Sequence, residues 1–196
     1  ADFVGDSLEL SRKAAGVEGR VIVFCGVRFM AETAALLAPD KTVLLPDEGA
    51  GCPMADMLEA EDLVEWKKQY PGRPVVLYVN TSAAAKAEAD LCCTSANADA
   101  VVASLPEEEI LFGPDKNLAA WTQRRTAKRI IAWDGWCHVH QGILPRDVAA
   151  ARTRHPGAVL WAHPECRPEV LDLADRVLST GGMVREAAAS AAADVI

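Results

Sequence analysis

Short apolar runs alternate with longer amphipathic or Ala-rich stretches along the whole chain. The runs are rich in Val, Ile and Leu, which predicts buried strands at residues 21–25, 42–45, 75–79, 91–93, 110–112, 130–133 and 159–162. The stretches between them predict helices at residues 7–15, 30–38, 61–70, 83–89, 98–104, 117–127, 145–155 and 168–174. This alternation predicts an α/β fold in which helices cover both faces of parallel sheets.

Polar and Gly positions recur at a spacing of 85 residues. The pairs related in this way are Cys52 and Cys137, Gly72 and Gly157, Tyr78 and His163, Asn80 and Glu165, and Thr94-Ser95 and Ser179-Thr180. Self-similarity at a fixed period is typical of one structural unit used repeatedly. Because one period holds several strands and helices, we expect homologous αβ units at residues 1–71, 72–156 and 157–196. The first unit is expected to lack its start and the third to be truncated.

The chemically informative residues lie at or just beyond the predicted strand ends. The strand at residues 130–133 is followed by a turn at Asp134 and Gly135, and we expect Cys137 and His140 on the exposed far side. Ligands of parallel α/β sheets bind at the carboxyl ends of the strands. Ser and Thr near helix starts can bind carboxylate or phosphate together with free backbone N–H groups. The residues with these placements are Cys52, Tyr78, Asn80, Ser95, Cys137, His163, Glu165, Ser179 and Thr180.

Charge and cysteine usage restrict the class of partner. The chain has 20 Lys and Arg against 28 Asp and Glu, a net charge of −8, and no basic cluster, which argues against a nucleic-acid surface. No apolar run approaches the length of a membrane span, and we expect neither a membrane segment nor a signal peptide. Six scattered cysteines are typical of a reducing compartment, so we expect a cytoplasmic protein.

Eight short motifs occur in a fixed order along the chain. They are Gly-Asp-Ser (5–7), Gly-Val-Arg-Phe-Met-Ala-Glu (26–32), Ala-Gly-Cys (50–52), Tyr-Val-Asn-Thr-Ser-Ala (78–83), Cys-Thr-Ser-Ala-Asn (93–97), Trp-Asp-Gly-Trp-Cys-His-Val-His (133–140), His-Pro-Glu-Cys (163–166) and Ser-Thr-Gly-Gly-Met (179–183). In this order they resemble the quinolinate synthase family, the iron–sulfur enzymes of de novo NAD biosynthesis. The resemblance covers essentially the whole chain.

The resemblance implies three homologous αβα domains around a pseudo-threefold axis. Each domain of the family gives one Cys to a [4Fe–4S] cluster whose fourth iron is open and acts as a Lewis acid. The implied reaction condenses iminoaspartate with dihydroxyacetone phosphate, with loss of phosphate and water, to form quinolinate. The implied partners are these two anionic substrates, an aspartate-oxidising enzyme as supplier of the imine, and a second copy of the chain in a homodimer.

Carried over by motif, the resemblance assigns a role to each candidate residue. Cys52 and Cys137 are the cluster ligands. The catalytic set consists of Tyr78 and Asn80, which hold the substrate, and His163 and Glu165, which transfer protons near the open iron. The carboxylates and phosphate are bound by Ser7, Ser95, Ser179 and Thr180.

Two departures from the family pattern affect the expected activity. The His-Tyr-Tyr motif that precedes Gly-Asp-Ser in the family is absent, and one further period after Cys137 falls beyond Ile196. The third cluster Cys is therefore expected outside this chain. We interpret the chain as an internal piece of the enzyme that does not turn over alone.

Other interpretations of the same residues remain open. The chain fits a non-catalytic αβ module that binds a phosphorylated metabolite, or a thiol-redox or zinc protein that uses Cys52 and Cys137, although no Cys-x-x-Cys pair supports zinc. Ser7 and Ser179 are also typical helix caps. His140 is either a residue that orients a ligand or a polar group satisfied by its neighbours. The remaining cysteines are expected to be core or structural thiols: Cys25, Cys92, Cys93 and Cys166.

Overall fold

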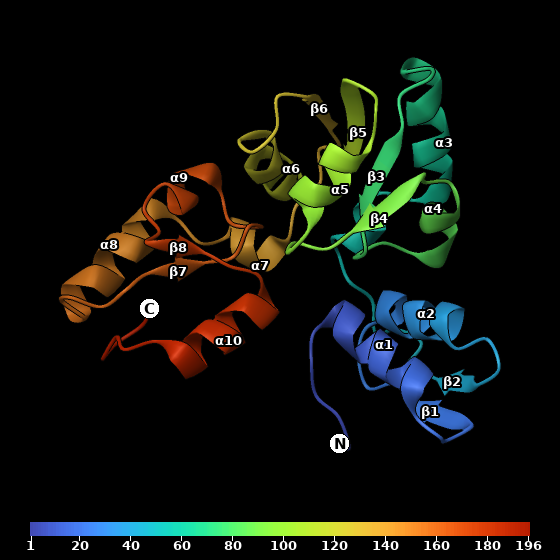
Figure 1. The fold of residues 1–196 in the computed structure, drawn as a ribbon, viewed down its shortest axis with the longest axis horizontal. Helices are drawn as coiled ribbons and strands as arrows, with labels where there is room; N and C mark the ends of the chain where they lie inside the picture. Colours follow the sequence, from blue (N-terminus) through green and yellow to red (C-terminus); the bar gives the residue numbers. More distant parts are fainter.

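The computed structural model describes residues 1–196 as three groups of helices and short strands that follow one another along the chain (Figure 1). The groups contain a two-stranded sheet with the order β1-β2, a four-stranded sheet with the order β4-β3-β5-β6, and a two-stranded sheet with the order β7-β8. All paired strands are parallel. This confirms the α/β class with parallel sheets. No helix has the length and apolar character needed to cross a membrane.

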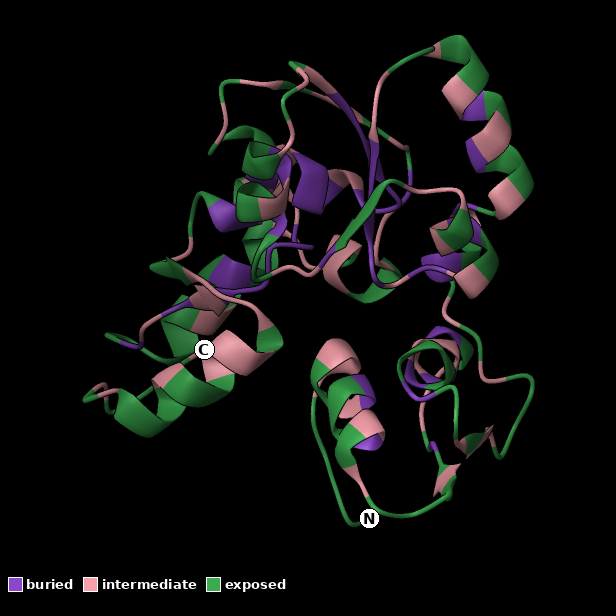
Figure 2. Ribbon diagram, turned by 45° about the vertical axis from the view of Figure 1, so that its right-hand side comes forward, coloured by how far each residue is buried: buried purple, intermediate pink, exposed green.

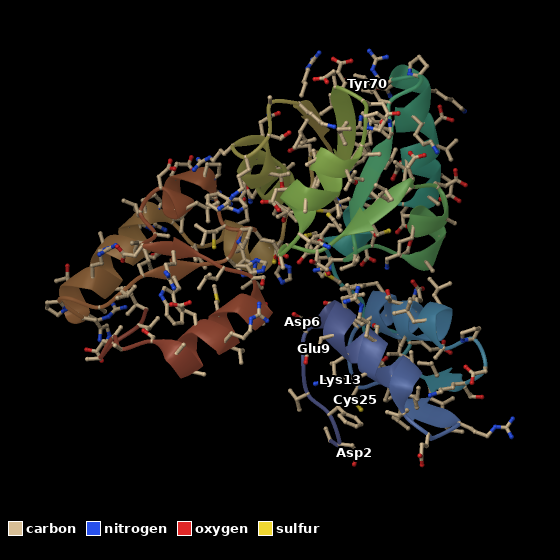
Figure 3. The ribbon with its side chains drawn as sticks, viewed as in Figure 1. Asp2, Asp6, Glu9, Lys13, Cys25 and Tyr70 are labelled. Atoms are coloured by element: carbon tan, nitrogen blue, oxygen red, sulfur yellow. The ribbon has the colours of Figure 1, made fainter.

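The first group consists of α1 (Ser7–Gly16), β1 (Val21–Val23), α2 (Arg28–Leu37) and β2 (Thr42–Leu44). The side chain of Asp6 caps α1 by accepting the backbone N–H of Glu9, and Glu9 forms an ion pair with Lys13 one turn later (Figure 3). The small core contains Ala14, Phe24, Ala31 and Ala34. Val21 and Val23 are exposed because this sheet has only two strands.

The second group is built around the four-stranded sheet. Its elements are η1 (Ala55–Met57), α3 (Ala60–Gln69), β3 (Val75–Tyr78), α4 (Ala83–Ala87), β4 (Leu91–Cys93), α5 (Ala98–Ser104), β5 (Glu109–Gly113), α6 (Lys116–Gln123) and β6 (Arg129–Ala132). Every residue of β3 is buried, as expected for a strand covered on both faces (Figure 2). One core cluster includes residues of α5 and α6, and another includes residues of α3 and α4. The largest fully buried side chains are concentrated in this group.

The third group consists of α7 (His138–Gln141), α8 (Pro145–Arg154), β7 (Trp161–Ala162), α9 (Pro168–Leu171), β8 (Arg176–Val177) and α10 (Thr180–Ala189). Its core contains buried residues of α8, β7 and α9 together with Cys166. Trp121 of α6 packs against this cluster and also against a core cluster of the second group. Figure 1 shows α7 where these two groups meet, and α1 and α10 on the same side of them.

The structure corrects several expectations. Cys25 and Cys92 were expected in the core, but both are exposed, because Cys25 follows a strand of a two-stranded sheet and Cys92 lies on the edge strand β4. Cys93 and Cys166 are buried as expected. The helices η1 and α7 were not predicted. Cys137 and His140 are half-buried rather than exposed, because Cys137 packs against a core cluster and His140 lies beside the buried Glu165.

Candidate functional site

Residues from all three groups line one pocket of about 220 Å³. Its lining consists of Asp6, Ser7, Leu8, Tyr78, Val79, Asn80, Thr94, Ser95, His140, His163, Glu165 and Thr180. Seven of the ten residues predicted for the site are in this lining, so residues more than 150 positions apart in the sequence do converge. The three others are Cys52, Cys137 and Ser179.

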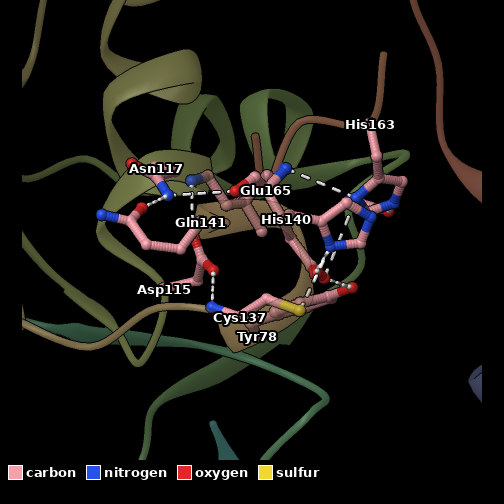
Figure 4. A network of polar contacts seen from close by, with 10 residues as sticks. Tyr78, Asp115, Asn117, Cys137, His140, Gln141, His163 and Glu165 are labelled. Carbon is pink, nitrogen blue, oxygen red and sulfur yellow. Dashed lines mark hydrogen bonds and ion pairs between the residues drawn. The ribbon is translucent and has the colours of Figure 1, made fainter. Parts of the chain in front are cut away.

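Glu165 is the centre of a buried polar network (Figure 4). It follows β7, is only 4% exposed, and its Oε1 accepts the O–H of Tyr78 at 2.6 Å. Its other oxygen, Oε2, lies 2.8 Å from Nδ1 of His140. Burial by itself raises the pKa of Glu165, but hydrogen bonds from His140 and Tyr78 and the nearby His163 ring hold this pKa below its ordinary value. Glu165 is therefore a carboxylate that accepts hydrogen bonds from both sides.

Tyr78, at the end of β3, and His163, directly after β7, both lie beside Glu165. Burial, and then the charge of Glu165, raises the pKa of Tyr78 well above its ordinary value, so its side chain is a neutral phenol that donates. Nδ1 of His163 accepts the backbone N–H of Glu165 at 3.3 Å, and its Nε2 lies 3.2 Å from Oγ of Ser95. This arrangement assigns the proton of the neutral ring to Nε2. Burial lowers the pKa of His163, which favours that neutral form.

His140 connects Glu165 to Cys137. Nδ1 of His140 lies 3.2 Å from Sγ of Cys137, and the His140 ring stacks on the His163 ring with 4.9 Å between centroids. The hydrogen bonds with Cys137 and Glu165 raise the pKa of His140 to about 10. Nδ1 of His140 thus has partners within the chain on both sides, Cys137 and Glu165.

The two predicted ligand cysteines lie against the same core cluster. Cys137 is the residue that precedes α7, and Cys52 comes shortly before η1; both are half-buried. Burial raises the pKa of the Cys52 thiol, the backbone N–H groups of Met54 and Ala55 oppose that shift, and the nearby Cys137 thiol adds to it. The structure thus brings the two thiols into one electrostatic environment.

Two buried polar residues that the sequence analysis missed hold these groups in place. Asp115 is fully buried; its Oδ2 accepts the backbone N–H of Cys137 at 3.0 Å, while Oδ1 caps α6. Asn117 donates through Nδ2 to the backbone oxygen of Glu165 at 3.0 Å and to Oε1 of Gln141 at 2.8 Å. An Asp before a helix is a recognisable capping residue, so the sequence could predict that role of Asp115. Its hydrogen bond to Cys137, 22 residues later, has no signal in the sequence.

The remaining predicted binders have different placements. Ser95 lies between the first pocket and a neighbouring pocket of about 240 Å³ that also includes Ser179. Oγ of Ser179 accepts the N–H of Gly182 at 3.2 Å, so Ser179 caps α10 and does not line the first pocket. Oδ1 of Asn80 is buried without a hydrogen-bond partner in the chain. An orphaned acceptor in a pocket lining is a position for a donor on a bound molecule.

Two overlapping donor sets can hold a metal or cluster. One is the thiol pair Cys52 and Cys137, and the other comprises Cys137, His140 and Glu165, whose donor atoms all lie within 4.8 Å of one another. Thiolates are the protein ligands of iron–sulfur clusters, whereas a mixed set of sulfur, imidazole and carboxylate is typical of single transition-metal ions.

Comparison with known proteins gives a consistent result. The family described as NadA: Quinolinate synthetase A protein matches residues 1–196. A quinolinate synthase of Methanoregula boonei is 59% identical over 185 residues, which cover 94% of this chain and 61% of that protein. One from Dehalococcoides mccartyi (strain ATCC BAA-2266 / KCTC 15142 / 195) is 59% identical over 96% of this chain and 62% of that protein. One from Thermodesulfovibrio yellowstonii is 56% identical over 100% of this chain and 65% of that protein. The chain thus spans 61–65% of the length of these relatives.

Proposed function

Because the chain belongs to the quinolinate synthetase A protein family, we propose that the protein containing it is a quinolinate synthase. In this proposal it condenses iminoaspartate with dihydroxyacetone phosphate to quinolinate, with loss of phosphate and water. The observation that carries the proposal is the network of Tyr78, His140, His163 and Glu165 beside Cys137 at one pocket.

The pocket suits small anionic substrates despite the acidic chain. Ser7 begins α1 and Thr180 begins α10, two helices of 10 residues whose first turns reach the lining. Free N–H groups and the positive end of the helix dipole favour carboxylate or phosphate at such positions. The hydroxyl of Ser95 can donate a hydrogen bond to a bound anion. The unpartnered Oδ1 of Asn80 can accept one from a substrate N–H or O–H.

Proton transfer is the proposed task of Glu165 and His163. Both are more than nine-tenths buried and line the pocket. Each side chain contacts a residue far away in the sequence: Tyr78, at the end of β3, donates to Glu165, and Ser95, in the loop after β4, lies beside His163. Fixed orientation of a carboxylate and an imidazole within reach of one substrate is what general acid–base catalysis requires. Tyr78 donates its O–H to the carboxylate and so keeps one of its oxygens fixed.

The thiol pair fits an iron–sulfur cluster. Cys52 and Cys137 are half-buried, lie in one environment, and offer the donor chemistry that such clusters use; the backbone N–H groups of Met54 and Ala55 contact Cys52. A bound [4Fe–4S] cluster with three thiolate ligands supplies an open, Lewis-acidic iron. In the proposal the third thiolate comes from sequence outside these 196 residues.

We further infer a pseudo-threefold repeat of units at 1–71, 72–156 and 157–196. Backbone details recurring at the same spacing of 85 residues support it. The strand registers Val76↔Leu91 and Trp161↔Arg176 correspond, as do the bounds of α3 and α8. Gly72 and Gly157 both have positive φ, at 77° and 88°. A cytoplasmic location, a homodimer and an aspartate-oxidising enzyme as imine supplier complete the proposal.

The test uses the longest natural polypeptide that contains these residues, reconstituted anaerobically with iron and sulfide. Cys52→Ser and Cys137→Ser are expected to lose the brown colour and the broad visible absorption, whereas Cys92→Ser, on an exposed edge strand, retains them. Glu165→Gln is expected to keep the cluster and lower kcat by about 10²–10⁴-fold. A full cluster in Cys52→Ser contradicts the ligand assignment. Unchanged turnover in Glu165→Gln contradicts the catalytic role.

A further inference from the structure

Cys137, His140 and Glu165 place three metal-ligating atoms within 4.8 Å of one another. Nδ1 of His140 lies 3.2 Å from Sγ of Cys137 and 2.8 Å from Oε2 of Glu165. A ring nitrogen carries at most one proton, so it cannot donate a full hydrogen bond to both neighbours. A single cation at the centre of these three atoms satisfies a thiolate, a carboxylate and a neutral imidazole together, and it takes the place of their protons.

The spacing of the three atoms is close to that of a tetrahedral zinc site. Bonds of about 2.3 Å to sulfur and about 2.0–2.2 Å to nitrogen and oxygen place tetrahedral ligand atoms about 3.3–3.6 Å apart. The two contacts of His140 Nδ1, at 3.2 and 2.8 Å, need to open by about half an ångström. All three atoms lie within 4.8 Å of one another, so the Cys137–Glu165 separation needs to close by about 1.2 Å at most. Side-chain rotation alone provides such a movement, because His140 and Cys137 are only half-buried.

The surroundings also match a three-ligand metal site. Tyr78 donates to Oε1 of Glu165 at 2.6 Å and so orients the carboxylate whose other oxygen faces His140. Outer hydrogen bonds of this kind fix the geometry of ligating carboxylates. His140 and Glu165 both line the pocket, which leaves a fourth position for water or a ligand. Sites with three protein ligands and one open position are typical of reactive rather than purely structural zinc.

We propose that, in the cluster-free protein, Cys137, His140 and Glu165 bind one divalent cation of the Zn²⁺ class. The cation and the iron–sulfur cluster then compete for the thiolate of Cys137, so that bound Zn²⁺ opposes cluster assembly. Cation binding itself is independent of the proposed function; only the competition rests on it.

The binding experiment uses Co²⁺ as a spectroscopic probe of the Zn²⁺ site in the longest natural polypeptide, stripped of metal under anaerobic conditions. We expect one equivalent of Co²⁺ with a thiolate charge-transfer band in the wild type and in Cys52→Ser, and no such band in Cys137→Ser. His140→Gln and Glu165→Gln are expected to raise Kd by about 100-fold or more, and Tyr78→Phe by about 10-fold, since loss of an outer partner alone costs 10–100-fold. His138→Gln, an exposed neighbour on α7, is the matched control and leaves Kd unchanged.

Two results overturn the site. If His140→Gln and Glu165→Gln bind Co²⁺ like the wild type, the cation is held by cysteines alone. If Cys52→Ser loses the band, the cation is at the cluster cysteines. The competition is tested separately: one equivalent of Zn²⁺ should slow cluster reconstitution in the wild type and do so less in His140→Gln. A cluster that forms at the same rate with and without Zn²⁺ refutes the competition, whereas a wild type that never assembles a cluster refutes the proposed function and leaves the Co²⁺ result intact.

Discussion

Removal of either of two carboxylates, Asp90 or Asp175, should destabilise the protein to a similar extent. Oδ2 of Asp90 accepts the backbone N–H of Val75 at 2.7 Å, and Oδ2 of Asp175 accepts that of Leu160 at 2.8 Å. The two pairs are related by the 85-residue spacing. In each case the backbone N–H of the Asp also donates to the carbonyl of the same residue, Val75 or Leu160. If the units are equivalent, the two Asp residues stabilise their units through the same pair of hydrogen bonds.

The expected cost follows from burial and charge. Val75 is fully buried and Leu160 is 7% exposed, so loss of the acceptor leaves a largely buried N–H without its partner. Hydrogen bonds to charged groups contribute about 1.5–3 kcal/mol, and we expect Asp90→Ala and Asp175→Ala each to lower the free energy of unfolding by about 2 kcal/mol. Asp175 also pairs with Arg152 at 3.1 Å, but this contact is half exposed and adds at most about 1 kcal/mol.

The assay is urea denaturation of the cluster-free polypeptide at pH 7, with Asp172→Ala as the control. Asp172 forms an exposed ion pair with Arg124 at 2.6 Å, whose loss should cost about 0–1 kcal/mol. The N–H of Leu160 lowers the pKa of Asp175, so its contribution is present above the unfolded pKa of about 3.9 and is lost as the pH falls through the lower folded value. A cost of about 2 kcal/mol for Asp90→Ala with a control-level cost for Asp175→Ala would refute the equivalence.

Two further predictions concern backbone packing and a buried charge. A Cβ at Gly135 would lie 2.5 Å from the backbone oxygen of Pro114, so Gly135→Ala should lower the free energy of unfolding, measured in urea, by about 1–3 kcal/mol. Gly16 has open space around it, so Gly16→Ala should stabilise α1 by up to about 1 kcal/mol. Equal effects of the two substitutions would contradict this account. Burial lowers the pKa of Lys86 to about 8, so between pH 8 and 10.5 the unfolded state binds more protons and this residue's contribution to stability rises with pH. We expect an NMR titration midpoint of the Lys86 Cε signal near pH 8, and a midpoint near 10.4 would rule out the shift.

The strands and the location of the pocket were predictable because their signals are local or periodic. Short apolar runs gave the parallel strands, since both faces of β3 and β5 are covered. The 85-residue spacing predicted that Tyr78 and Glu165 would occupy comparable strand ends, and the structure joins them at 2.6 Å. Cys52 and Cys137 are separated by the same 85 residues, and both pack against the same core cluster.

The parts that could not be predicted depend on contacts without a sequence period. Asp115 and Asn117 hold Cys137 and Glu165 through hydrogen bonds to backbone atoms 22 and 48 residues away, and any residue at the partner position offers the same backbone group. The exposure of Cys25 and Cys92 depends on how many strands each sheet has and on which strand is at its edge. A short apolar run does not contain that information.

The proposed repeat also explains how similar backbones produce a site with unequal chemistry. Equivalent strand ends carry Tyr78 and Asn80 in one unit and His163 and Glu165 in the next. Two copies of Tyr and Asn would supply neutral donors and amides, which orient a substrate but exchange no proton near neutral pH. With His and Glu in place of one pair, a carboxylate contacts the phenol of Tyr78, and an imidazole lies beside that carboxylate. In the proposed function, substrate orientation and proton transfer therefore belong to different units, and the hydrogen bond between Tyr78 and Glu165 joins the two parts of the site.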